Sequence, residues 1–314
     1  MDKMQAVIID PNEPGHVAVR EVEAPRPAAN EALVRGVTTS LTPVEVYYSQ
    51  SKDPMRPIGC DVAGVVEQPA ADGSGPKAGA RVIGRLRTGA WAELIAAPTD
   101  ALAEIPDNVS FEEAATLPTS GLTALYALEK GERLLARNVL ITAANGSVGL
   151  FTCQIAKLMG THVVGQIRHE RNGQLVAQAG ADEVVVSADA SETGKFGPYK
   201  LIAEAVGGVV LANCMTQLAA DGICVIYGNL SRSNSTFEAL SFFRQPRVKL
   251  YGFIISNEFG LEPASSGLAR LAQLVSQGKL KTRVTVEESL QHVDQLIQDL
   301  EANKIDGKAV IHLT

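Results

Sequence analysis

The chain lacks the features that would direct it to a membrane or to nucleic acid. Its longest apolar runs fall well short of the ~18 residues that a membrane-spanning helix needs. The opening residues contain neither an apolar core of signal-peptide length nor a cleavage-site pattern. Lys and Arg number 28 against 35 Asp and Glu, which gives a formal net charge of −7, and there is no basic run. We therefore expect a cytoplasmic protein that binds neither membranes nor nucleic acid.

Cysteine is also scarce, and its spacing excludes two kinds of site. The cysteines are too far apart for a disulfide framework, and no closely spaced pair could begin a structural zinc site. What remains, 46% hydrophobic and 20% charged residues in 314, is globular composition with room for two or three domains. The four cysteines are Cys60, Cys153, Cys214 and Cys224.

Short β-rich runs separated by turn residues fill the first part of the chain. Such spacing predicts a small barrel or sandwich. The predicted strands are 5–9, 17–22, 32–39, 62–68, 81–84 and 91–96.

After about residue 106, strands alternate with helices. The strands are nearly continuous in apolar residues, which is typical of a parallel sheet covered by helices on both faces. Two βαβαβ halves then predict a doubly wound α/β domain of the dinucleotide-binding type. A tail beyond residue 260 is expected to return to the first domain. The predicted strands are 138–143, 162–167, 183–186, 200–205, 222–227, 248–253, 283–286 and 308–313, and the predicted helices are 111–117, 122–130, 148–159, 173–179, 209–218, 267–277 and 290–303.

A glycine-rich turn joins the first strand of the predicted parallel sheet to its helix. In G-x-G-x-x-G terms the slots hold Ala144, Gly146 and Gly149. Without a Cβ, Gly146 would let a pyrophosphate approach the backbone, and Gly149 would let the helix pack closely on the strand. The alternative is an ordinary tight strand–helix turn. The residues predicted to bind a dinucleotide diphosphate at this helix N-terminus are Ala144, Asn145, Gly146, Ser147, Val148 and Gly149.

The end of the next strand bears on the choice of cofactor. A cofactor without a 2′-phosphate usually meets Asp or Glu there, but this chain continues from Gln166 into Arg168, His169 and Arg171. Arg168 or Arg171 could pair with a 2′-phosphate, with His169 at the rim. We therefore predict NADPH rather than NADH; the alternative is a solvated basic loop.

Further short motifs run along nearly the whole chain, at 57–66 (PIGCDVAGVV), 79–84 (GARVIG), 114–118 (AATLP), 204–208 (EAVGG) and 305–310 (IDGKAV). With the turn at 143–149, their order and spacing resemble the medium-chain dehydrogenase/reductase superfamily, in its zinc-free quinone oxidoreductase and enoyl reductase branch. The resemblance implies a GroES-like catalytic domain over 1–116, a Rossmann NADP-binding domain over 117–255, and a return to the catalytic domain over 256–314.

The resemblance also implies site residues. Thr123 should lie near the nicotinamide, and Tyr227, Gly228 and Phe253 should line the cofactor channel.

Two candidate catalytic residues follow in the same way. Tyr47 matches a tyrosine that faces the cleft in the family, and Thr42 stands where Asn is usual. A phenol can donate a proton to the reduced substrate. The alternative is that Tyr47 only packs against the ring or orients water.

Zinc-using relatives carry a catalytic His where this chain has Cys60, and a Cys ligand where it has Thr42. Cys60 and Asp61 could ligate a metal ion, but no third ligand is visible. We therefore expect no metal and interpret Cys60 as a small core thiol. Hydride transfer to a conjugated acceptor needs little electrophilic help, because the developing negative charge is delocalised.

The sequence thus predicts an NADPH-dependent oxidoreductase that reduces a quinone or an α,β-unsaturated carbonyl compound. An enoyl-thioester reductase, a non-catalytic NADPH-binding protein and a zinc alcohol dehydrogenase are the alternatives.

The apolar edge strand 247–253 predicts a homodimer. Arg85 and Arg87 are expected to be solvated at the rim, and Phe242 and Phe243 to be core residues.

Overall fold

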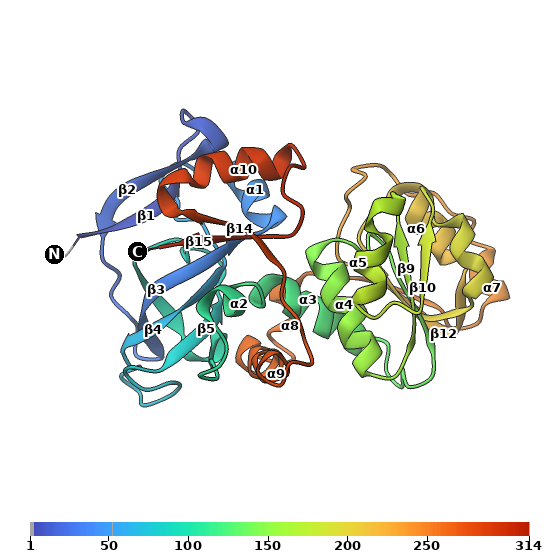
Figure 1. The fold of residues 1–314 in the computed structure, drawn as a ribbon, viewed down its shortest axis with the longest axis horizontal. Helices are drawn as coiled ribbons and strands as arrows, with labels where there is room; N and C mark the ends of the chain where they lie inside the picture. The colour runs from blue at the N-terminus through green and yellow to red at the C-terminus, as the bar shows by residue number, and fades with distance from the viewer. Residues whose placement is uncertain (1–2, 52, 314) are drawn as a thin grey trace. The chain divides into compact units, whose positions relative to one another are not determined.

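The computed structural model describes residues 3–51 and 53–313, which form two compact units (Figure 1). The first unit contains the chain up to Leu122 and again from Phe259, and the second runs from Thr123 to Glu258. The first division therefore falls within helix α3 (Pro118–Glu129). Over the described ranges, no helix is both long enough and apolar enough to span a bilayer.

The first unit is mainly antiparallel. Its larger sheet has the order β14-β15-β3-β4-β5-β7, with β6 paired to β3, and β1 and β2 form a separate hairpin. Strand β15, from the C-terminal tail, pairs antiparallel with β3, so the tail completes the sheet as the sequence predicts. The strands are β1 (Lys3–Ile9), β2 (Val17–Glu23), β3 (Glu31–Leu41), β4 (Asp61–Gln68), β5 (Arg81–Arg85), β6 (Leu94–Pro98), β7 (Leu102–Glu104), β14 (Val284–Ser289) and β15 (Lys308–His312).

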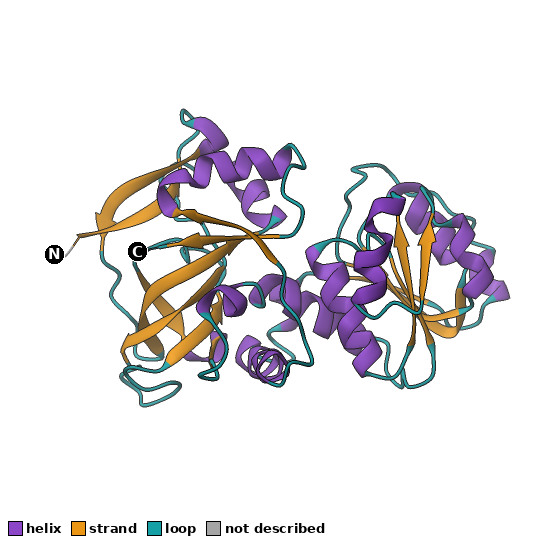
Figure 2. Ribbon diagram, viewed as in Figure 1, coloured by secondary structure: helices purple, strands orange, loops and turns teal. Residues whose placement is uncertain are grey.

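Helices in the first unit cover its sheets, and α10 packs against β2 and α1 (Figures 1 and 2). Helix α1, which the sequence analysis missed, begins with a capping box: Thr42 accepts a hydrogen bond from an early helical N–H, and Glu45 accepts one from the backbone of Thr42. Pro43 fixes the first helical residue. The helical segments are α1 (Pro43–Ser49), α2 (Phe111–Ala115), α9 (Ala264–Ser276) and α10 (Val293–Glu301), with 3₁₀ turns at Pro14–His16, Thr99–Ala101 and Leu290–His292.

The second unit contains one parallel sheet with the order β10-β9-β8-β11-β12-β13, which confirms the doubly wound fold. Helices α4 and α5 lie on one side of the sheet and α6 on the other (Figures 1 and 2). The strand order reverses direction at β8. The elements are β8 (Asn138–Ile141), α4 (Ser147–Leu158), β9 (His162–Ile167), α5 (Gly173–Gln178), β10 (Glu183–Val186), β11 (Tyr199–Glu204), α6 (Gly208–Met215), β12 (Leu218–Ile226), α7 (Ser241–Arg244), β13 (Lys249–Gly252) and α8 (Ile255–Glu258), with 3₁₀ turns at Glu170–Asn172 and Ser191–Phe196.

Each unit has its own apolar core. Trp91 is fully buried in the first, and Tyr199 in the second. All four cysteines are free and buried. Phe242 packs against the second core beside Phe237, but Phe243 is 82% exposed. The expectation of a core role was therefore wrong for Phe243, because α7 is a single short turn that buries one of two adjacent side chains.

Candidate functional site

A groove of about 360 Å³ lies at the carboxyl ends of the strands of the second unit. These ends form the upper edge of the sheet in Figure 1. The groove spans β8, where the strand order reverses, which is the place at which open α/β sheets bind ligands. It is lined by Ala143, Asn145, Gly146, Gln166, Arg168, His169, Asn172, Ala188, Val206, Gly207, Gly208, Val209, Val210, Leu230, Ser231 and Ser233.

The glycine turn between β8 and α4 forms one wall of this groove. A Cβ on Gly149 would lie 2.6 Å from the carbonyl oxygen of Ala143, so the helix can approach the strand only with glycine there, as predicted. A Cβ on Gly146 would meet that oxygen at 3.3 Å, and Gly146 is exposed. No side chain caps α4, which leaves the first-turn N–H groups of Ser147 and Val148 available to an anion.

Gln166 fixes this turn from the end of β9, a role that the sequence analysis did not reveal. Its side chain is buried; Oε1 accepts a hydrogen bond from the N–H of Ala143 at 3.1 Å, and Nε2 donates to the carbonyl of Ser187 at 2.5 Å. Its own carbonyl accepts from the N–H of Ala144 at 3.0 Å. These bonds tie together the ends of β8, β9 and β10. They also hold Ala143 at a φ of 46°, which a non-glycine residue seldom adopts.

Basic side chains stand at the outer end of the groove. Arg168 and His169 line it and are exposed. Arg171, in the 3₁₀ turn that follows, is exposed but is not part of the lining. Among the described residues that line the groove there is no Asp or Glu. The groove therefore offers positive charge where a ribose-binding carboxylate would otherwise stand.

A buried carboxylate shapes the opposite wall, at the turn between β11 and α6. Glu204 is 0% exposed and accepts hydrogen bonds from the N–H groups of Val206 at 2.7 Å and Gly207 at 3.0 Å. Thr142, after β8, donates its hydroxyl to Glu204 at 3.3 Å. Burial raises the pKa of Glu204 by more than these hydrogen bonds lower it, so the pKa lies above its ordinary value. Gly207 and Gly208 adopt φ of 72° and 56°, so the turn that borders the groove requires glycine.

The remaining predicted cofactor residues lie outside this lining. Thr123 is buried on α3, and Phe253 is buried just after β13. Tyr227 follows β12, and burial raises its pKa. Gly228 packs so closely that a Cβ would lie 2.7 Å from the carbonyl oxygen of Ala205. The groove thus brings together Asn145, Gly146, Arg168 and His169 of the predicted set.

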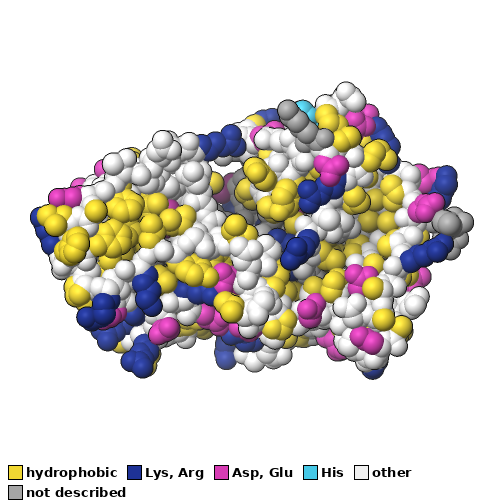
Figure 3. Space-filling view, turned by 180° about the vertical axis from the view of Figure 1, so that it is seen from behind, with side chains coloured by type: hydrophobic (Ala, Val, Ile, Leu, Met, Phe, Trp, Pro, Cys, Tyr) yellow, Lys and Arg dark blue, Asp and Glu magenta, His cyan; other side chains and the backbone are white. Residues whose placement is uncertain are grey.

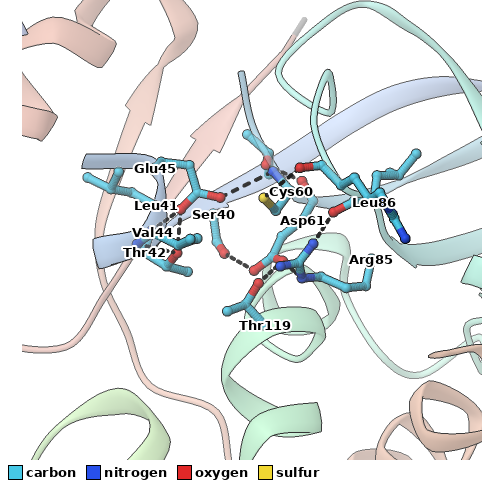
Figure 4. Close-up of polar contacts among 12 residues, drawn as sticks. Ser40, Leu41, Thr42, Val44, Glu45, Cys60, Asp61, Arg85, Leu86 and Thr119 are labelled. Carbon is cyan, nitrogen blue, oxygen red and sulfur yellow. Dashed lines mark hydrogen bonds and ion pairs between the residues drawn. The ribbon is translucent and has the colours of Figure 1, made fainter. Parts of the chain in front are cut away.

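A second group of polar side chains is buried in the first unit, and we call it the ionic cluster: Glu45, Asp61, Arg85 and Lys308, each at most 6% exposed. Figure 4 shows Glu45, Asp61 and Arg85 with their polar contacts. The Asp61 carboxylate lies at its centre. Hydroxyl groups of Ser40 and of the α3 residue Thr119 donate to Asp61 at 3.0 and 2.5 Å. The Nε of Arg85 and the Nζ of Lys308 lie 3.8 and 3.9 Å from its carboxylate oxygens.

Glu45 joins this cluster to helix α1. It accepts hydrogen bonds from the N–H groups of Thr42 at 2.9 Å and Cys60 at 3.1 Å, and from the Thr42 hydroxyl. Burial, with the nearby Asp61 carboxylate, raises the pKa of Glu45, while burial lowers the pKa of Lys308. The hydroxyl of Thr42, a predicted catalytic residue, is therefore engaged in capping the helix.

Arg85 corrects another expectation. It was expected at a solvated rim, yet it is 6% exposed, since Asp61 compensates its charge and the carbonyl of Leu86 accepts from its Nη1. Its Nε has no hydrogen-bond partner among the described residues. Arg87 is exposed, as expected.

Tyr47 presents the opposite case. It is 73% exposed on α1, with its ring centroid 5.9 Å from that of Tyr48. The phenol is accessible, and the capping box holds the helix that carries it.

Metal ligands do not gather in either unit. Within residues 3–51 and 53–313 there is no group of three or more His, Cys, Asp or Glu side chains that could hold a metal ion.

Two family models match separate parts of the chain. The model described as an alcohol dehydrogenase GroES-like domain matches residues 28–107, and the one described as a zinc-binding dehydrogenase matches residues 147–273.

Curated relatives extend this similarity. A quinone oxidoreductase of Mus musculus is 31% identical over 223 residues, covering 66% of this chain and 67% of its own. A chloroplast envelope quinone oxidoreductase homolog of Arabidopsis thaliana is 29% identical over 315 residues, covering 92% and 90%.

Solved structures agree in fold. A mycobacterial protein complexed with NADPH superposes with a TM-score of 0.86 at 25% identity, over 98% of this chain and 99% of the other. The quinone oxidoreductase of Escherichia coli complexed with NADPH gives 0.87 at 22% identity, over 98% and 99%.

Proposed function

The chain belongs to the medium-chain dehydrogenase/reductase superfamily, in its quinone oxidoreductase branch, and on that premise we propose that it is an NADPH-dependent, zinc-independent reductase of quinones or α,β-unsaturated carbonyl compounds. The GroES-like domain and the Rossmann-type parallel sheet of this family are both present, as the sequence predicts. The relatives are oxidoreductases by name, and two structural neighbours are complexes with NADPH.

The groove at the carboxyl ends of the parallel strands is the single observation that carries the cofactor assignment. Its glycine turn offers backbone N–H groups to a diphosphate. Its described lining residues include Arg168 and no Asp or Glu, which favours a cofactor that bears a 2′-phosphate. The side-chain amide of Gln166, at the strand end, is hydrogen-bonded to the backbone of Ala143 and Ser187 and is therefore not available to a ribose.

The chemistry divides between cofactor and chain. When bound, the reduced nicotinamide supplies the hydride. The N–H groups at the start of α4 would hold the diphosphate, and Arg168 would pair with the 2′-phosphate. Tyr47, with its exposed phenol, donates a proton to the substrate oxygen.

Replacing Tyr47 by Phe tests this last role. General acid catalysis contributes about 10²–10⁴-fold, so kcat should fall by roughly that factor while the dissociation constant of NADPH stays unchanged. An unchanged kcat would reduce Tyr47 to a wall residue. Tyr48→Phe, on the same helix, is the matched control.

A zinc ion does not fit the residues present in the ionic cluster. The Asp61 carboxylate is engaged by two hydroxyl groups and lies beside Arg85 and Lys308, whose positive charges would repel a metal ion. Burial raises the pKa of the Cys60 thiol, and zinc binding requires the thiolate. These contacts support a reaction without zinc.

Two copies of the chain pair through strand β13 in this proposal, along residues 247–253. Strand β13 is the edge of its sheet, and Lys249, Leu250 and Gly252 on it are exposed. An open apolar edge is a template for pairing, and two-fold symmetry is the commonest closed arrangement. A monomeric mass in dilute solution would contradict the dimer.

Turnover is the decisive test of the function. Oxidation of NADPH and of NADH is followed with quinones, enones and enoyl thioesters as acceptors. We expect consumption of NADPH with quinones or enones, faster than of NADH. Turnover with enoyl thioesters alone would change the substrate class. Tight NADPH binding without any turnover would make the chain a binding protein.

A further inference from the structure

A second hollow lies at the opposite end of the parallel sheet, where the strands begin. Its volume is about 750 Å³, within the ~300–1,000 Å³ typical of small-molecule sites. None of its lining residues lines the cofactor groove. We call it the basal hollow, and it is lined by Glu132, Arg133, Ala136, Arg137, Asn138, Pro198, Lys200, Ala219, Ala220, Asp221, Arg247 and Lys249.

The basal hollow is strongly basic in an acidic protein. Its lining carries five Lys or Arg and two Asp or Glu side chains, a balance of 5 − 2 = +3, whereas the whole chain carries −7. Lys and Arg side chains gather along the lower edge of the second unit in Figure 3, the edge at which its strands begin. These charges come from the segments before β8 and β13 and from β11, β12 and β13 themselves, so only the fold brings them together.

Contacts within the protein engage only some of the basic side chains of the basal hollow. Arg247 pairs with Asp221, its second terminal nitrogen 2.7 Å from a carboxylate oxygen, and Lys200 donates to the Asp221 carbonyl at 2.6 Å. The side chains of Arg133 and Arg137 make no hydrogen bond or ion pair with another described residue, whereas Lys249 interacts with the Asp221 carboxylate and helps to lower its pKa. Two cations of the lining, Arg133 and Arg137, are thus left without a protein partner among the described residues.

The backbone around the hollow is unusual too. Five of the eleven non-glycine residues with positive φ among those described line it. Such conformations cost energy, persist where the surroundings enforce them, and cluster at ligand sites. The cofactor groove has one of its own, Ala143. The five are Glu132 (45°), Arg133 (39°), Ala136 (57°), Asp221 (58°) and Arg247 (61°).

From this charge and geometry we infer that the basal hollow is a second binding site, for a small anion that carries two or more adjacent phosphate groups. A lone phosphate ion is far smaller than the hollow, whereas a chain of phosphates can meet both Arg133 and Arg137 at once. The site is separate from the proposed catalytic cofactor site, because the two lie at opposite ends of the same strands.

Titration calorimetry with inorganic triphosphate at low ionic strength tests this inference. We expect the full-length protein to bind it, more weakly as salt is added. In the double variant Arg133→Gln/Arg137→Gln, affinity should fall about tenfold or more, since each exposed ion pair contributes up to roughly fivefold. Both residues precede β8, so the edge strand β13 is untouched.

Three controls identify the site. The variant Arg133→Lys/Arg137→Lys keeps the charges and should bind normally. Lys77→Gln removes an exposed charge from the first unit and should change nothing. Arg168→Gln should also leave this affinity unchanged, whatever it does to NADPH binding. An unchanged melting temperature shows that each variant is folded.

The source of the phosphates is distinguished in the Arg168→Gln protein, with ATP in place of triphosphate. Equal affinity assigns the site to phosphate groups alone, and tighter binding assigns it to a nucleotide; both support the site. The inference is overturned if triphosphate does not bind at millimolar concentration, if Arg133→Gln/Arg137→Gln binds as the unaltered protein does, or if Arg168→Gln abolishes binding.

Discussion

The cofactor groove and the ionic cluster place polar groups in two different ways. The groove is made largely of backbone, with glycine turns at Gly149 and Gly207 and a free helix N-terminus. The ionic cluster is made of charged side chains such as Asp61 and Arg85, withdrawn from water. The groove leaves backbone N–H groups available to a ligand, whereas the Asp61 carboxylate of the cluster is engaged by the hydroxyl groups of Ser40 and Thr119. We therefore interpret the buried charges of the cluster as structural, and the free N–H groups of the groove as a binding site.

The largest expected effect comes from removing the centre of the cluster. Asp61→Ala would leave Arg85 and Lys308 buried without their carboxylate. Losing one partner of a buried ion pair costs about 3–5 kcal/mol, so the free energy of unfolding in urea should fall by that amount.

An exposed ion pair in the same unit is the matched control. Glu67 lies 2.8 Å from Arg35, and both side chains are about half exposed. Glu67→Ala should therefore cost no more than about 1 kcal/mol. If Asp61→Ala were no more costly than Glu67→Ala, the cluster would not stabilise the fold.

Substitutions of two glycines in the same turn distinguish a packing role from a binding role. Gly149→Ala forces a Cβ to within 2.6 Å of a carbonyl oxygen and should destabilise the protein by about 1–3 kcal/mol. Gly146→Ala meets its nearest atom at 3.3 Å and should change stability by less than about 1 kcal/mol.

The affinity for NADPH should not follow the stability of the two variants. Because the Cβ of Gly146→Ala would stand where the diphosphate approaches, this variant should bind NADPH more weakly although it stays folded. Thermal unfolding and fluorescence titration measure the two effects. Normal NADPH affinity in Gly146→Ala would contradict the proposed position of the diphosphate.

A smaller effect concerns the buried carboxylate of the groove. The pKa of Glu204 is raised above its ordinary 4.5, so the folded state holds this proton more tightly than the unfolded state does. The free energy of unfolding should therefore fall as pH rises from about 4.5 to the folded pKa, and then level off.

Glu204→Gln removes this contribution and should flatten the profile over that range. Urea unfolding at a series of pH values measures it. Glu192→Gln removes an exposed carboxyl group from the same unit and is the matched control. Identical slopes in Glu204→Gln and the unaltered protein would contradict the account.

Much of the groove could be predicted from the sequence, because a βα turn depends on local spacing. The position of Gly149 after an apolar strand was enough to identify the close helix–strand contact. The signal for Glu204 was present as an acidic residue between a buried strand and a Gly-Gly pair, but its bonds to backbone N–H groups appear only in three dimensions.

The ionic cluster could not be predicted in the same way. Its members come from α1, β4, β5 and β15, and nothing local distinguishes a buried Arg85 from an exposed Arg87 two residues later. Helix α1 was missed because only seven residues form it, although Thr42, Pro43 and Glu45 carry a recognisable capping pattern. The basal hollow could not be predicted either, because its residues also come from elements that lie far apart in the sequence.

The most direct test of the central claim is the affinity of Arg168→Glu for the two nicotinamide cofactors. A charge-assisted hydrogen bond contributes about 1.5–3 kcal/mol, so NADPH should bind roughly ten- to hundredfold more weakly, whereas NADH should change little. Equal losses for NADPH and NADH, or no loss for either, would contradict the placement of the 2′-phosphate at the end of β9.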